Sequence, residues 1–375
     1  MADPGSTLNV PYDIVVIVVH ALAKDLSGFE PTVYAALRTL CLVNREWCAL
    51  ARPHLYSYVW LAKLRNHILF CRTVTAAPHL GALVRDLKSY IFLRGSDGWR
   101  AGTTALGGPF APPMTRAAAE ALTNLRALAF ASDAAVVTVP QPLLAAMAHC
   151  ARCARLRALS LSGFSFMSFA LLRDFVQGFR GVATLRVRRC DWLPNRIAPP
   201  VPAHAPVESV RSVDIHAMAT TANSLLNLTG PAVTELKLWC RGMSGGPDTC
   251  SAIRRYSALR SIELTYDGAE VHWMIDALGN VSSPAVSQVV INHVLRRLTP
   301  SSGSVAREYT ERLDHLLCEP RFLGLQRVVV RVYLPVLHDG EVWMKLVVDA
   351  FPQCQARGIL ISSVHEGDPD ETRNV

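Results

Sequence analysis

The sequence predicts an α/β fold in which a short N-terminal helical segment precedes a curved solenoid of repeated strand–helix units. Three observations support this prediction: a recurring phrase of spaced apolar residues, helix-compatible sequence between its copies, and two amphipathic segments within the first fifty residues. The chain has 375 residues, of which 50% are hydrophobic. It is therefore long enough to bury a substantial core.

The recurring phrase has an apolar residue followed at the third and usually the fifth position by further apolar residues. Clear copies begin at residues 125, 156, 182, 210, 233, 259, 286 and 325, and fainter copies begin near residues 84 and 356. Most of the steps between successive starts fall within or close to the period of about 20–29 residues that is typical of leucine-rich repeats. Because one such unit cannot bury its apolar face alone, neighbouring units are expected to stack into a solenoid.

The sequence between the phrases favours helices. The stretches "FALLRDFVQGF", "DTCSAIRRYSA", "VHWMIDALGNV" and "TERLDHLLCEP" carry apolar residues at three- and four-residue spacing. A doubly wound sheet would also alternate strands and helices, but it should show a glycine-rich phosphate turn or a catalytic turn and little internal repetition. Repetition of the phrase favours the solenoid. Residues 95–115 and 194–206 are rich in proline and glycine, so we expect loops there.

The opening run "PYDIVVIVVHAL" has strong strand propensity but also accepts a helix. Pro11 suits a first helical turn, Asp13 favours the positive end of the helix dipole, and Ile14 and Ile17 fall on one face with Val18 and Leu22. A second amphipathic segment follows. Its apolar residues recur at three- and four-residue spacing at Leu37, Leu40, Val43, Trp47 and Leu50.

Together, the two segments resemble the F-box, whose motifs are a leading Leu-Pro-x-Glu and a later Val-Cys-Arg-x-Trp. Here the matching residues are Val10-Pro11-x-Asp13 and Val43-Asn44-Arg45-x-Trp47, so Val10 replaces Leu, Asp13 replaces Glu and Asn44 replaces Cys. The resemblance covers residues 8–52. The whole chain resembles a fungal F-box protein in which residues 53–375 form degenerate leucine-rich repeats.

This resemblance implies a function in protein degradation. An F-box is a three-helix module that docks onto the Skp adaptor of a cullin–RING ubiquitin ligase, and the repeats that follow it select a protein substrate. Such a receptor performs no chemistry itself and raises the effective concentration of its substrate near the conjugating enzyme. The positions carried over as adaptor contacts, or as packing that shapes them, are Val10, Pro11, Ile14, Ile17, Leu40, Val43 and Trp47. A repeat scaffold without ligase function is the alternative.

Residues that alternate with the apolar positions of each phrase are expected to point away from the core, because strand side chains have a period of two. In the middle repeats this row is polar and charged. The sequence therefore predicts a substrate-contact surface made of Arg186, Arg188, His216, Lys237 and Trp239. The alternative is a solvated face without a partner, since exposed strand positions are polar in any solenoid.

An esterase is the rival hypothesis. Gly242-Met243-Ser244-Gly245-Gly246 fits the nucleophile-elbow motif G-x-S-x-G, with Asp314 and His338 as triad partners in chain order. Against it, the preceding strand is a repeat phrase and Gly246-Pro247 is typical of an ordinary turn. No P-loop, G-x-G-x-x-G or H-E-x-x-H motif occurs, and the Cys150/Cys153 pair lacks a second pair at zinc-finger distance. No cofactor and no metal are predicted.

Charge and hydropathy bear on partners and location. The net charge is +8, but the arginines are dispersed rather than gathered with aromatic residues, so we predict no nucleic-acid partner. The apolar run at residues 14–23 is about half the ~20 residues that span a bilayer. The residues before it contain neither Lys nor Arg, unlike a secretory signal. We therefore expect a cytoplasmic or nuclear protein without membrane association.

Overall fold

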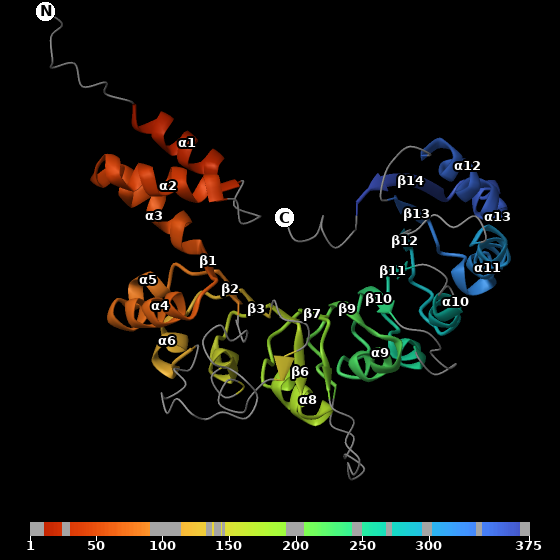
Figure 1. Cartoon of the computed structure of the whole chain (residues 1–375), viewed down its shortest axis with the longest axis horizontal. Helices are drawn as coiled ribbons and strands as arrows, with labels where there is room; N and C mark the ends of the chain where they lie inside the picture. The colour runs from red at the N-terminus through yellow and green to blue at the C-terminus, as the bar shows by residue number, and fades with distance from the viewer. Residues whose placement is uncertain are drawn as a thin grey trace, which may run out of the picture.

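The computed structural model describes residues 11–24, 31–90, 114–132, 137–138, 144, 147–192, 206–241, 250–267, 272–294, 302–334 and 340–367. In these segments, strands and helices alternate to form an arc whose strands line the inner side and whose helices cover the outer side (Figure 1). A unit of three helices lies at one end of the arc and the last strand lies at the other. The predicted α/β repeat solenoid is therefore confirmed at the level of its architecture.

One parallel sheet of eleven strands runs along the arc in the order β1-β2-β3-β5-β7-β9-β10-β11-β12-β13-β14. Its strands are β1 (Tyr58–Leu61), β2 (Asp86–Tyr90), β3 (Ala127–Ala131), β5 (Ala158–Ser162), β7 (Thr184–Arg188), β9 (Ser212–Met218), β10 (Glu235–Arg241), β11 (Ser261–Asp267), β12 (Gln288–Val294), β13 (Arg327–Leu334) and β14 (Leu360–Glu366). A second sheet has the order β4-β6-β8 and comprises β4 (Val137–Thr138), β6 (Phe164–Phe166) and β8 (Asp191–Trp192).

Each copy of the phrase begins one to three residues before a strand and supplies its core. All 24 apolar positions of the eight clear copies are at most 4% exposed. These positions are Leu125, Leu128, Phe130, Leu156, Leu159, Leu161, Val182, Leu185, Val187, Val210, Val213, Ile215, Val233, Leu236, Leu238, Leu259, Ile262, Leu264, Val286, Val289, Ile291, Leu325, Val328 and Val330. In-register pairing aligns these residues from strand to strand, so each unit packs its apolar residues against those of both neighbours.

The faint terminal copies are explained by the same register. Phe130 is paired with Ser89 of β2, and Val330 is paired with Ser362 of β14, so a serine takes the place of an apolar residue in each of these strands. Ser89 is buried and forms a hydrogen bond with the His67 ring, whose other nitrogen lies 2.9 Å from the Lys63 carbonyl oxygen. These serines explain why the two copies are faint in the sequence, and beyond Ser89 the row continues at the buried Leu61 of β1.

The connecting helices of the repeats are α4 (Leu64–Ala76), α5 (Pro78–Gly81), α6 (Arg116–Ala121), α8 (Phe169–Gln177), α9 (Ala219–Leu226), α10 (His272–Gly279), α11 (Ser302–Leu317), α12 (Gly340–Ala350) and α13 (Pro352–Ala356). Three of the four predicted helical stretches are α8, α10 and α11. The fourth, "DTCSAIRRYSA", instead contains a 3₁₀-helix, η3 (Ser251–Arg255). Its fully buried residues Cys250, Ile253 and Tyr256 recur every third position, which matches the three residues per turn of a 3₁₀-helix.

Two further 3₁₀-helices, η2 (His149–Arg152) and η4 (Pro320–Phe322), precede β5 and β13. The sequence did not predict β1, which joins the helical unit to the solenoid by pairing with β2. Nor did it predict the small second sheet. The predicted loops fall mostly at 95–113 and 194–205, which lie outside the described residues.

The N-terminal unit consists of α1 (Tyr12–Lys24), α2 (Pro31–Val43) and α3 (Arg45–Ser57). The opening apolar run is therefore a helix, as predicted, and not a strand. Val15 and Val19, one helical turn apart, are buried with Val33, Leu37 and Ala51 in a core separate from that of the solenoid. A strand would have placed neighbouring valines on opposite faces, whereas the helix gathers one apolar stripe into this small core.

The helices α2 and α3 are joined at a tight corner. Asn44 is the only residue between them, and its side chain accepts a hydrogen bond from the Trp47 backbone N–H at 2.9 Å. An N-cap of this kind stabilises the first turn of a helix. The helix α3 continues past residue 52, the predicted end of the unit, to Ser57. There, the Tyr34 hydroxyl donates a hydrogen bond to the Tyr58 carbonyl, which ties α2 to the start of β1.

Stability is expected to fall as the pH drops below about 6.5. The His293 ring stacks on Tyr266 with the ring centroids 4.2 Å apart, and burial lowers its pKa to about 4. The unfolded chain, with a histidine pKa near 6.5, binds this proton more readily than the folded chain. The stabilisation is therefore fully present above pH 6.5 and is lost as the pH falls toward 4. Between these limits, we expect a loss of roughly 2–3 kcal/mol, measured by urea unfolding.

The control for this prediction is removal of the titrating ring. His293→Gln should flatten the dependence of unfolding free energy on pH. Equal slopes for the parent chain and His293→Gln would show that His293 does not titrate with folding.

Candidate functional site

Two regions stand out: an exposed apolar end of the three-helix unit and a row of charged residues on the inner face of the arc. In the helical unit, α2 and α3 lie side by side and are joined by one residue (Figure 1). The His20 ring of α1 lies 5.4 Å from the His54 ring of α3, so α1 packs against α3 at these residues. The start of α1 and the corner between α2 and α3 lie on the same side of the unit (Figure 1).

Large apolar side chains are exposed at this end. Ile14 is 47% exposed and Ile17 is 62% exposed, whereas Val15 and Val19 on the same helix are buried. At the end of α2, Leu42 is 86% exposed and Val43 is 56% exposed. We call Ile14, Ile17, Leu42 and Val43 the apolar end. Large apolar side chains that are left in solvent at one end of a helical unit are candidates for an interaction surface.

The predicted adaptor residues divide between this surface and the core beneath it. Pro11, Ile14, Ile17 and Val43 are exposed. Leu40 and Trp47 are half-buried and pack against the small core. Val10 lies outside the described residues. Their role in adaptor binding stays a prediction. The exposed residues are the ones that a partner could contact, whereas Leu40 and Trp47 support the surface from the core.

The charged row on the inner face comes from four adjacent strands. Pairing aligns Arg186, Asp214, Lys237 and Glu263 across β7, β9, β10 and β11. Arg188 Nη2 lies 2.8 Å from Asp214 Oδ2, and Lys237 Nζ lies 2.8 Å from Glu263 Oε2. Cross-strand pairs of opposite charge stabilise a sheet and here fix the orientation of the basic groups.

Burial separates the basic groups of this row. The Arg186 side chain is 58% exposed and its Nε lies 4.0 Å from Asp214 Oδ2, whereas only 17% of the Arg188 side chain is exposed. The Lys237 side chain is 44% exposed. Arg186 and Lys237 are thus the cations of this row that solvent or a partner can reach.

The predicted contact residues His216 and Trp239 are not open to solvent. They are in-register neighbours whose rings stack at 4.2 Å with an interplanar angle of 8°, and each residue is 3% exposed. Aromatic residues at cross-strand positions pack on each other and remove apolar area from water. The structure therefore brings all five predicted substrate residues together, but it buries two of them. Their role in substrate binding stays a prediction.

Sequence reasoning placed acidic and amide groups on the same outward row but did not select them as contact residues. The buried Asn292 donates hydrogen bonds from Nδ2 to Glu263 Oε1 at 2.8 Å and to Thr265 Oγ1 at 3.0 Å. Asp214 and Glu263 occupy the fifth position of their phrases, next to the chosen basic residues in space but 26 to 28 residues away in sequence. The common position within the phrase was the signal that could have found them.

The esterase hypothesis gains no support from the described residues. Ser244 and His338 lie outside them. The Asp314 carboxylate is 1% exposed and accepts hydrogen bonds from the backbone N–H groups of Gln353 and Cys354, at 2.8 and 2.9 Å. It therefore holds the start of α13, and its role in a catalytic triad stays a hypothesis because His338 is not among the described residues.

Asp314 also belongs to a group of three side chains whose potential metal-ligand atoms lie close together. Its carboxylate and the sulfur atoms of Cys318 and Cys354 lie within 4.8 Å of one another. Burial, and then the hydrogen bond to Asp314, raise the pKa of the Cys354 thiol well above its usual value. Both oxygens of the carboxylate already accept backbone N–H groups, so this group of side chains is a hydrogen-bonded cluster in the structure. Burial likewise raises the pKa of Cys153 to about 11.

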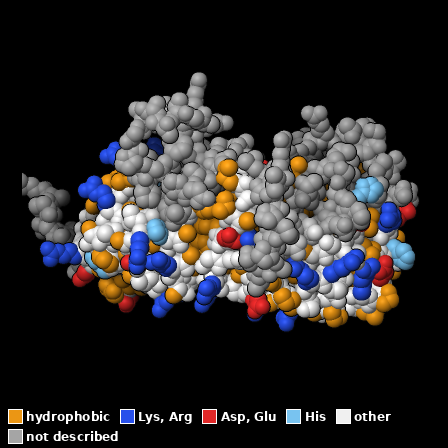
Figure 2. Space-filling model, turned by 90° about the horizontal axis from the view of Figure 1, so that it is seen from below, with side chains coloured by type: hydrophobic (Ala, Val, Ile, Leu, Met, Phe, Trp, Pro, Cys, Tyr) orange, Lys and Arg blue, Asp and Glu red, His pale blue; other side chains and the backbone are white. Residues whose placement is uncertain are grey.

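Figure 2 shows one face of the molecule, on which Lys and Arg side chains of the described residues are spread along the whole length, with Asp and Glu between them. None of the described helices has the length and the apolar character required to cross a membrane.

Comparison with known proteins returned structural likeness only. No protein-family model matches the chain, and no curated protein matches it in sequence. Among solved structures, an internalin C2 from Listeria monocytogenes has a TM-score of 0.33 and 11% identity, over 70% of this chain and 91% of that one. An internalin (inlF) from the same organism has a TM-score of 0.26 and 10% identity, over 70% and 86%. The assignment of the fold rests on the register of the chain's own strands.

Proposed function

We propose that this protein is the substrate-recognition subunit of a Skp–cullin–F-box ubiquitin ligase. In this proposal, the helices α1–α3 dock the Skp adaptor, and the inner face of the solenoid binds a protein substrate, with Arg186 and Lys237 as its accessible cations. The cullin and RING subunits would join through the adaptor. A cytoplasmic or nuclear location follows from this role.

The observation that carries the proposal is the apolar end of the helical unit. Its four residues occupy positions that the F-box resemblance marks as adaptor contacts, or lie next to them, and they leave large apolar side chains in solvent while a separate small core stabilises the helices. A surface of this kind lowers the free energy when a partner covers it. The departures at Asp13 and Asn44 do not involve the four residues of the apolar end, and the departure at Val10 lies outside the described residues.

Co-purification with a Skp adaptor tests this proposal. The parent chain is expected to form a stoichiometric complex on gel filtration. The double variant Ile14→Asp/Ile17→Asp should bind at least about 100-fold more weakly, because charges replace two exposed apolar contacts, a loss of about 2.7 kcal/mol. Both side chains are exposed, so the variant should keep the circular dichroism spectrum of the parent chain.

A matched control is available on the solenoid. Leu323 is 78% exposed and lies in the turn before β13, so Leu323→Asp introduces a charge without touching the helical unit. This variant should bind the adaptor like the parent chain. A folded parent chain that binds no adaptor would overturn the ligase proposal and leave a repeat scaffold for protein binding as the function.

A further inference from the structure

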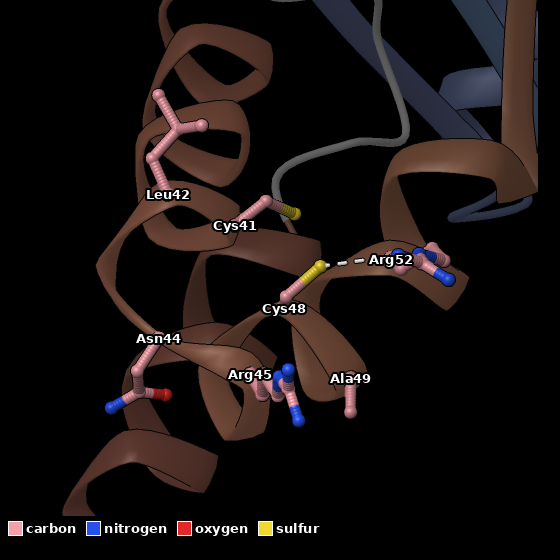
Figure 3. Close-up of a pocket in the computed structure, with 7 residues that line it drawn as sticks. All are labelled: Cys41, Leu42, Asn44, Arg45, Cys48, Ala49 and Arg52. Atoms are coloured by element: carbon pink, nitrogen blue, oxygen red, sulfur yellow. Dashed lines mark hydrogen bonds between the residues drawn. The ribbon is translucent and has the colours of Figure 1, made fainter.

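A pocket of about 450 Å³ lies at the corner between α2 and α3, beside the apolar end. It is lined by Cys41, Leu42, Asn44, Arg45, Cys48, Ala49 and Arg52 (Figure 3). Cys41 comes from the last turn of α2 and Cys48 from the first turn of α3. The single-residue corner brings these two turns together, so both cysteines line the same pocket.

A guanidinium group completes the arrangement. Arg52 lies one turn after Cys48 on α3, and its Nη2 donates a hydrogen bond to Cys48 Sγ at 3.4 Å. Arg52 therefore supplies positive charge where negative charge resides on the sulfur when Cys48 acts as a nucleophile. For Cys41, burial is the largest cause that raises the pKa of its thiol, followed by the neighbouring Cys48, while Arg52 has a smaller opposing effect. The two sulfurs therefore differ in their surroundings: Cys48 faces the cation and Cys41 faces Cys48.

Both thiols are also accessible. Cys41 and Cys48 are half-buried and line an open pocket, whereas Cys71, Cys150, Cys153, Cys190, Cys240, Cys250 and Cys354 are buried. Cys318 is half-buried, but its neighbouring thiol, Cys354, is fully buried beside the Asp314 carboxylate. Among the described cysteines, Cys41 and Cys48 alone combine a shared pocket, access from solvent and an adjacent cation.

We propose that Cys41 and Cys48 form a peroxide-sensitive dithiol that closes to an intramolecular disulfide between α2 and α3. The Cys48 thiolate attacks one oxygen of hydrogen peroxide, the O–O bond breaks, and the hydroxide that leaves takes up a proton, which gives a sulfenic acid and water. The Cys41 sulfur then attacks the Cys48 sulfur, and the sulfenic hydroxyl leaves as a second water with the Cys41 proton. Two thiols are oxidised and one peroxide is reduced to two waters.

The disulfide would act on the neighbouring apolar end. Cys41 directly precedes Leu42 and Val43 in the last turn of α2, so pulling its sulfur into a covalent bond with Cys48 shifts the turn that carries both exposed side chains. A loss of adaptor affinity in the oxidised form rests on the proposed function. We expect this loss to be about tenfold. Formation of the disulfide does not depend on that function.

Peptide mapping without reductant tests the chemistry directly. After treatment of the full chain with hydrogen peroxide, mass spectrometry should find the peptides of Cys41 and Cys48 joined, with the loss of two hydrogens, and dithiothreitol should separate them. Cys48→Ser should abolish the cross-link. Arg52→Gln should slow its formation about tenfold and Arg52→Lys should restore part of the rate. Arg52 is exposed, so these variants are expected to fold like the parent chain.

A control variant and three contrary results decide between the dithiol proposal and its alternatives. Cys318→Ser changes the other half-buried cysteine and should leave the cross-link unaffected. Recovery of Cys41 and Cys48 as free thiols after peroxide treatment would overturn the proposal, as would equal oxidation rates for the parent chain and Arg52→Gln. If the disulfide forms but adaptor binding is unchanged, regulation of the apolar end is wrong and the ligase function stands. If the reduced chain also fails to bind the adaptor, the proposed function is wrong while the dithiol chemistry stands.

Discussion

Replacement of Asp314 by alanine is expected to lower the free energy of unfolding by about 3 kcal/mol. The two oxygens of this buried carboxylate accept the backbone N–H groups of Gln353 and Cys354, which are 39 and 40 residues away in the sequence. Alanine would leave both N–H groups without an acceptor in a place that water does not reach, and each such group costs roughly 1–3 kcal/mol. The C-terminal segment of the arc, α13 and β14, should lose protection against hydrogen exchange first.

Two variants separate this capping role from a general effect of removing charge. Asp314→Asn keeps one carbonyl acceptor, so its loss in urea unfolding should be about half that of alanine. Asp349 lies on the exposed face of α12, and Asp349→Ala should change the stability by less than about 0.5 kcal/mol. A value for Asp314→Ala within that same range would contradict the assignment of Asp314 as the cap of α13.

The repeat architecture could be predicted from sequence because the spacing of apolar residues within a strand is a local signal. The phrase that begins at Leu259, for example, places Ile262 and Leu264 on one face of β11, and both are fully buried. The three- and four-residue spacing of apolar residues between the phrases indicated helices, but it did not distinguish an α-helix from a 3₁₀-helix. The stretch around Ile253 is a 3₁₀-helix because its buried residues recur every third position, and a spacing of three is also compatible with an α-helix.

The candidate site could be predicted only in part, because its interactions join residues that are distant in the sequence. The alternating pattern selected Lys237 and Trp239 equally, since both occupy outward positions of one strand. Only the pairing of strands reveals that Lys237 meets Glu263, whereas the Trp239 ring stacks on His216 and is buried. The apolar end could not be predicted for the same reason. The packing of α1 against α2 and α3 decides which apolar residues of α1 stay in solvent, and this packing cannot be predicted from one sequence.

The largest loss of stability is expected at the centre of the apolar row, where Leu264→Ala should cost about 3–4 kcal/mol. This leucine is fully buried in β11 and is paired in register with Leu238 of β10 and Ile291 of β12. Truncation removes apolar contacts and leaves a cavity that rigid neighbours on both sides cannot fill. Urea unfolding measures the cost, and Leu323→Ala at an exposed turn should change it by less than about 0.5 kcal/mol.

The position of a residue along the row should govern the cost. In a solenoid, each unit is stabilised by contacts with its two neighbours, so a central defect weakens two interfaces and a terminal one weakens a single interface. Ser362 occupies the equivalent position in β14, is only half-buried and has one neighbouring strand, so Ser362→Ala should be close to neutral. If Leu264→Ala were no more destabilising than Ser362→Ala, the apolar row would not be what holds the repeats together.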